Sequence, residues 1–148
     1  LMALCKKGRV DIAQKRIVSY WGGMMDLGAT SIWEEYVPGL AGDAHYSLYG
    51  EPYGKSLCHA WGSGPICFLG KYVAGVRPTS VGYRTYEVCP NPGLYENFKA
   101  TVPLNGGKVS VEYADGKVTV LSDCDGGTLV WNGKKYPIQK NARLNRVN

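Results

Sequence analysis

The sequence has no long hydrophobic run, although 45% of its 148 residues are hydrophobic. No stretch approaches the roughly 18 successive apolar residues of a candidate transmembrane helix, so we expect no membrane partner. Charged residues make up only 20% of the chain, a balance typical of a globular protein that buries a core and unlike that of a disordered one. The length suits one ordinary domain or two small ones.

The chain also lacks a cluster of basic residues. Its 17 Lys and Arg outnumber its 12 Asp and Glu, which gives a net charge of +5, but the surplus is scattered over strand-like sequence. A nucleic-acid interface gathers its basic residues on one face or along one helix. We therefore interpret the charges as a solvated surface and expect no nucleic-acid partner.

Histidine is scarce, and the cysteines follow no ligand pattern. There are two His and five Cys, none of the cysteines in a C-x-x-C pair. The odd number argues against a disulfide framework in a chain of this size. Neither His45 nor His59 has a second ligand at zinc-finger spacing. The sequence thus predicts no metal and no cofactor, and we interpret Cys58 as a small buried thiol rather than a nucleophile.

The first residues, LMALCKK, resemble the middle of a helix, with no initiator Met and no basic and apolar leader. We therefore expect the chain to be the closing portion of a longer protein. The missing segment before Leu1 would carry any signal peptide.

Two stretches combine ionisable side chains with indole rings. They are GATSIWEEY at 28–36 and GKSLCHAWG at 54–62. Partial desolvation beside an indole suits a carboxylate to carrying protons, and a flat indole face packs well on the C–H face of a sugar. The combination predicts a carbohydrate site. The alternative is that Trp33 and Trp61 are core residues and that Glu34 and Glu35 are solvated.

The periodicity of apolar residues predicts helices in the first half. Residues 1–25 are expected to form a helical hairpin that turns at Gly8, with Asp11 as the second N-cap and Ile17 and Met24 on one buried face. Residues 26–53 are expected to form a long, functional connection. A third helix is expected over 55–74, kinked at Pro65.

The period of the apolar pattern changes to two after about residue 76, which predicts short strands. The pairs Asp115-Gly116 and Asn132-Gly133 are typical of two-residue hairpin turns. Short strands with frequent turns indicate an antiparallel β-sandwich over 77–148, and the polar end of the chain, 141–148, is expected to be frayed. The predicted domains are therefore 1–76, which is helical, and 77–148.

Three segments together resemble the C-terminal end of bacterial α-L-rhamnosidases of glycoside hydrolase family 78. They are GATSIWE at 28–34, SLCHAWG at 56–62 and GVRP at 75–78. In that family an (α/α)6 toroid of paired helices is followed by a small C-terminal β-sandwich. The resemblance implies an α+β fragment in which 1–76 supplies the last helices of the toroid. The rest of the catalytic domain, before Leu1, would then be its partner.

The resemblance also implies a mechanism. The family is inverting, so one carboxylic acid protonates the leaving oxygen while a second carboxylate activates a water on the opposite face of the sugar. The family's base matches Glu34, with Glu35 as the competing candidate. His59 matches its sugar-binding histidine, and Trp33, Trp61 and Tyr36 would complete the binding surface. The general acid of the family lies upstream of this chain.

The substrate and the class of function keep alternatives open. Cys58 stands where other members have Asn before the His, so a terminal α-L-rhamnoside is the leading substrate and another α-linked deoxy or uronic sugar is the alternative. The resemblance favours a periplasmic or secreted protein. The competing functions are a non-catalytic carbohydrate-binding module and a purely structural C-terminal module.

Overall fold

The computed structural model describes residues 1–147. They form two compact units, Leu1–Cys67 and a second that begins at Phe68. The first unit holds most of the helical residues and the long connection, and the second holds shorter helical turns and all the strands that are part of sheets. No helix among the described residues is long and apolar enough to cross a membrane.

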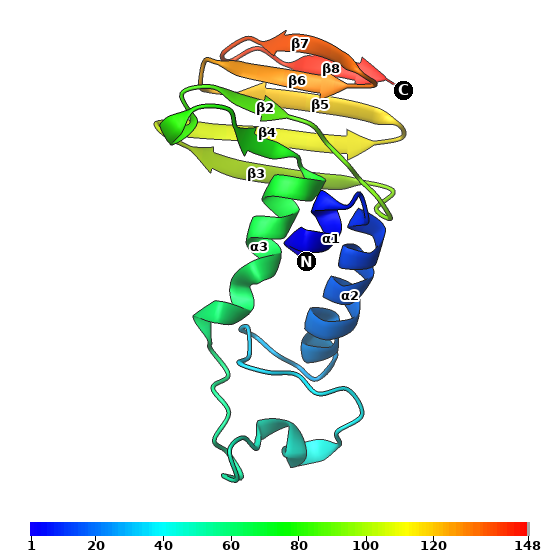
Figure 1. The fold of residues 1–148 in the computed structure, drawn as a ribbon, viewed down its shortest axis with the longest axis vertical. Coiled ribbons are helices and arrows are strands. Elements are labelled where there is room, and N and C mark those ends of the chain that lie inside the picture. Colours follow the sequence, from blue (N-terminus) through cyan, green and yellow to red (C-terminus); the bar gives the residue numbers. More distant parts are fainter. Residues whose placement is uncertain (148) are drawn as a thin grey trace. The chain divides into compact units, whose positions relative to one another are not determined.

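The predicted helical hairpin is present in the first unit. It consists of α1 (Met2–Lys6) and α2 (Val10–Asp26), drawn in blue in Figure 1, with Gly8 between them at φ +74°. Ile17 and Met24 are buried as expected. The N-cap prediction was wrong. Arg9 occupies that position, and the Asp11 carboxylate accepts hydrogen bonds from the Arg9 guanidinium at 3.2 Å instead of capping the helix.

The long connection after α2 is irregular apart from a 3-10 turn, η1 (Gly42–Tyr46), and a single bridge between Leu48 and Glu51. It continues to His59, further than the sequence predicts. The third helical segment begins only with η2 (Ala60–Ser63), followed by α3 (Gly64–Phe68) and η3 (Leu69–Val73), a π-helical turn. The prediction of helix from residue 55 was wrong because the main chain of 55–59 forms hydrogen bonds with residues 32, 34 and 46 instead of with a helical turn.

The second unit contains two four-stranded sheets. One has the order β1 (Val76–Pro78), β2 (Tyr86–Val88), β6 (Gly127–Trp131) and β7 (Lys134–Ile138). The other has the order β3 (Phe98–Leu104), β4 (Gly107–Ala114), β5 (Lys117–Ser122) and β8 (Leu144–Val147). A further 3-10 turn, η4 (Val81–Tyr83), precedes β2. Strands β2 to β8 carry their labels in Figure 1.

Alternating side chains from both sheets form one core, which confirms the coarse prediction of a β-sandwich. The fully buried members include Val88, Val111, Val120 and Leu129. Both predicted hairpins are present. Asp115 and Gly116 join β4 to β5, and Asn132 and Gly133 join β6 to β7, all with the positive φ that such turns need.

Two details of the sandwich differ from the sequence prediction. The sheets are not purely antiparallel, because β2 pairs with β6 in parallel. The end of the chain is not frayed over 144–147, because β8 pairs with β5 through four residues. The last residue of the predicted frayed segment, residue 148, lies outside the described part.

The boundary between the two units falls earlier than the predicted domain boundary at 76/77. Residues 68–75 belong to the same unit as the sheets. The amide of Asn91 donates to the carbonyl of Val73 at 2.9 Å, and the amide of Cys89 donates to the carbonyl of Gly75 at 3.0 Å. The division into a toroid end and a sandwich domain stays a prediction, since the helices of residues 1–147 alone do not make a toroid.

Candidate functional site

Glu34 is held by main-chain contacts with a segment about twenty residues away. Its amide donates to the carbonyl of Ser56 at 2.9 Å, and its Oε2 accepts a hydrogen bond from the amide of Ser56 at 3.2 Å. The side chain is only 11% exposed. The carboxylate therefore has a fixed orientation and does not point into bulk solvent.

His59 lies beside this carboxylate. Its Nδ1 is 3.7 Å from Glu34 Oε2, and its side chain is 30% exposed. The amide of His59 donates to the carbonyl of Ile32 at 2.8 Å, which aligns the second motif with the first. The structure thus brings together the acid and the imidazole that the sequence analysis selected from separate motifs.

Trp61 completes the cluster. Its ring centroid is 4.1 Å from that of His59, and its Nε1 donates to the main-chain carbonyl of Glu34 at 3.1 Å. The residue is nevertheless 67% exposed. One end of the indole is tied to the site while much of its surface is open, an arrangement that suits contact with a sugar. We call Glu34, His59 and Trp61 the acid–imidazole–indole cluster.

The other two predicted binding residues have different surroundings. Trp33 is 4% exposed, and its ring packs edge-on against Tyr46 at 5.9 Å. Tyr36 stacks on the ring of His45 at 5.8 Å, and its amide donates to the hydroxyl of Tyr20 at 3.0 Å. Neither is joined to the cluster by a contact described here: Trp33 is buried against Tyr46 and Tyr36 is held by His45 and Tyr20, so their direct contact with sugar stays a prediction.

Glu35, the competing base, is turned to another partner. Its Oε2 lies 3.8 Å from Nζ of Lys55, and its side chain is 44% exposed while that of Lys55 is fully buried. Lys55 was not among the predicted site residues, because a lysine in a Gly- and Tyr-rich segment carries no sign that it will be buried.

Two further supports of the site have no sequence signal. Nε1 of Trp21 on α2 donates to the carbonyl of Gly62 at 2.7 Å. A side chain at Gly62 would collide with that of Ile32, so only glycine allows η2 to approach the first motif this closely.

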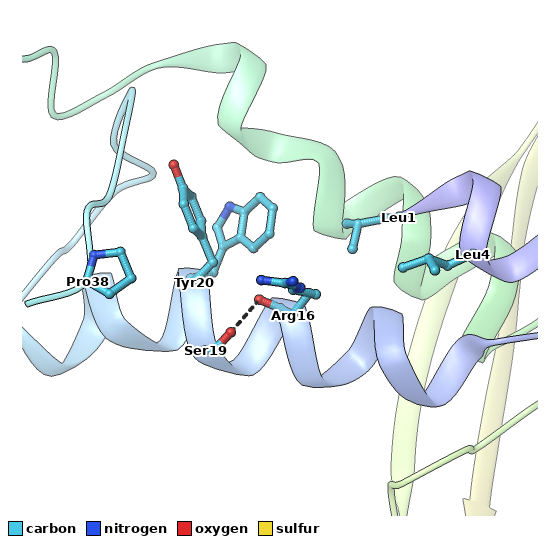
Figure 2. A pocket seen from close by; sticks show the side chains of 7 residues that line it. Leu1, Leu4, Arg16, Ser19, Tyr20 and Pro38 are labelled. Atoms are coloured by element: carbon cyan, nitrogen blue, oxygen red, sulfur yellow. Dashed lines mark hydrogen bonds between the residues drawn. The ribbon is translucent and has the colours of Figure 1, made fainter.

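A cavity of about 400 Å³ lies elsewhere in the first unit and is separate from the cluster. Figure 2 shows Arg16, Ser19 and Tyr20 of α2 facing it, with Leu1 and Leu4 at one end and Pro38 at the other. Its lining includes no member of the acid–imidazole–indole cluster. Within residues 1–147, no group of three or more His, Cys, Asp or Glu could hold a metal ion.

Comparison with solved structures identifies the chain as related to glycoside hydrolases. One protein that it resembles is the family 78 (GH78) rhamnosidase of Bacillus sp. GL1, with 27% sequence identity and a TM-score of 0.67 over 86% of this chain. This confirms the resemblance predicted from the sequence motifs. The match covers 14% of the rhamnosidase, so the chain spans only a small part of that protein's length.

A second solved structure, described as a kojibiose phosphorylase from the human microbiome, matches 62% of this chain and 14% of its own. Its identity is 10% and its TM-score 0.41, values too low to support an argument. No family model matches the sequence, and no curated protein matches it.

Proposed function

We propose that this chain supplies the general base and part of the sugar-binding surface of a larger inverting glycoside hydrolase that acts on terminal α-L-rhamnosides. One observation supports the proposal above all others. The carboxylate of Glu34 is nearly buried, held by the amide of Ser56, and set 3.7 Å from the imidazole of His59. The likeness to a family 78 rhamnosidase indicates the sugar.

The two oxygens of Glu34 suit different tasks. Oε2 is engaged by the amide of Ser56, and we assign the catalytic task to Oε1. The lone pairs of Oε1 would take a proton from a water molecule as that water attacks the anomeric carbon. Because the carboxylate is already oriented, little reorganisation is needed at the moment of reaction.

The neighbouring rings would hold the substrate. The imidazole of His59 can donate or accept a hydrogen bond with a sugar hydroxyl, and the exposed face of Trp61 can pack on the C–H face of the ring. The carboxylic acid that protonates the leaving oxygen would lie in a part of the full-length protein outside this chain.

The test is Glu34→Gln in the full-length protein, assayed on a p-nitrophenyl α-L-rhamnoside. Gln keeps the size of the side chain and can still accept the hydrogen bond from Ser56, but it cannot take a proton. We expect kcat to fall by about 10²–10⁴-fold, the usual contribution of general acid–base catalysis, with the melting temperature little changed.

Glu35→Gln is the matched control, since it makes the same chemical change one residue away. We expect a much smaller loss of kcat from it. A larger loss from Glu35→Gln would assign the base to Glu35. Unchanged kcat in both variants would favour a non-catalytic module and contradict the proposal.

A further inference from the structure

Lys55 is an unusual residue for a surface connection. Its side chain is fully buried, and among residues 1–147 its Nζ has no hydrogen-bond partner. Burying an ammonium group is costly unless an opposite charge compensates it. The carboxylate that approaches it is that of Glu35, whose Oε2 lies 3.8 Å away.

Lys55 also stands at the junction of the segments that hold the base. Its own amide donates to the carbonyl of Tyr46 at 3.0 Å, and the next residue, Ser56, exchanges two hydrogen bonds with Glu34. The two adjacent acids therefore diverge. Glu34 contacts Ser56 and His59, and Glu35 contacts the ammonium of Lys55.

We propose that Lys55 is a positioning residue for Glu34, an inference that rests on the proposed function. Its buried charge attracts the carboxylate of Glu35 and so keeps 34–36 in register with 55–56, the register that directs the Glu34 carboxylate toward His59. Attraction between opposite charges about 4 Å apart is stronger when one of them is shielded from water. The same pair keeps the negative charge of Glu35 away from the carboxylate of Glu34, the proposed base.

The experiment is a double-mutant cycle in the full-length protein, with Lys55→Met and Glu34→Gln made singly and together. Met preserves most of the length of Lys and removes the charge. We expect Lys55→Met alone to lower kcat by between about tenfold and the roughly 10²-fold that a 1 Å misplacement can cost, with KM changed much less. In the Glu34→Gln background we expect it to lower kcat no further, because there is no base left to position.

Glu35→Gln provides a second variant, since it breaks the same pair from its exposed side and leaves the core intact. It should lower kcat by about tenfold, again with no added effect on Glu34→Gln. This variant gives a result even if Lys55→Met does not fold.

The outcomes separate this inference from the proposed function. If Glu34→Gln lowers kcat as expected but neither Lys55→Met nor Glu35→Gln does, the positioning role alone is wrong. If they lower kcat equally with and without the Glu34 carboxylate, their role is general stability and the inference is also overturned. If Glu34→Gln leaves kcat unchanged, the proposed function fails, and the positioning role with it.

Discussion

At the scale of single residues, a hydrogen bond satisfies the hydroxyl of Tyr86, one of the largest side chains buried in the sandwich. Tyr86 is 1% exposed, and its hydroxyl donates to Oγ of Ser122 at 2.7 Å. Burial raises the pKa of Tyr86, and the hydrogen bond to Ser122 partly offsets that rise. Ser122 in turn is hydrogen-bonded to Lys108 and Cys124, so one hydroxyl pair links β2 to β5 across the core.

We expect Tyr86→Phe to lower the free energy of unfolding by roughly 1 kcal/mol, because it removes one buried hydrogen bond and little apolar area. Urea unfolding measures the change. Tyr113→Phe is the control, since it removes the same hydroxyl while Phe can keep the ring contacts of Tyr113 with Phe98 and Trp131. Equal losses from both variants would show that the bond to Ser122 contributes nothing.

At the scale of elements, α2 contains two adjacent glycines, of which one has room for a larger side chain and the other does not. Gly22 and Gly23 both lie within the helix. A Cβ at Gly22 would meet only Val18 Cγ1 at 4.0 Å, whereas a Cβ at Gly23 would overlap the ring of Tyr36. The second glycine therefore allows the segment that follows Glu34 and Glu35 to pack against α2.

Gly22→Ala should stabilise the protein by about 0.5–1 kcal/mol, the difference in helix propensity between the two residues. Gly23→Ala should destabilise it by about 1–3 kcal/mol, the usual range for overpacking. Thermal unfolding of the two variants in parallel tests both statements. Stabilisation by Gly23→Ala would contradict the packing of Tyr36 on α2.

At the scale of the whole molecule, the part of the chain that matches the rhamnosidase covers 14% of that protein's length. Inverting hydrolysis needs an acid and a base about 6.5–9.5 Å apart. The carboxylate of Glu34 lies beside the imidazole of His59, its main-chain carbonyl accepts a hydrogen bond from the indole of Trp61, and Glu35 is paired with Lys55. Under the proposed function, this site would supply the base and another part of the full-length protein would supply the acid.

We accordingly expect the 148-residue chain, purified alone, to release no p-nitrophenol from a p-nitrophenyl α-L-rhamnoside. The full-length protein assayed under the same conditions is the positive control. Turnover by the short chain that disappears with Glu34→Gln would show that it contains its own acid, and would contradict the division of roles proposed above.

Local patterns were enough to predict much of the fold. The spacing of Ile17 and Met24 determined the buried face of α2, and Asp115-Gly116 and Asn132-Gly133 determined two hairpins. The buried helix face and the two turns each depend on residues that are adjacent in sequence or one or two helical turns apart, so they follow from local interactions. The two aromatic motifs were also identified from residue types, and the structure places His59 of the second beside Glu34 of the first.

Only the tertiary structure decided which acid faces His59 and which faces a buried lysine. Glu34 and Glu35 are adjacent and chemically alike, and they differ because Ser56 and Lys55, about twenty residues further on, meet them differently. The parallel pairing of β2 with β6, the strand at 144–147 and the irregular course of 55–59 have the same origin. In each case main-chain groups form hydrogen bonds with residues distant in sequence, and a pattern of neighbouring residues does not predict those partners.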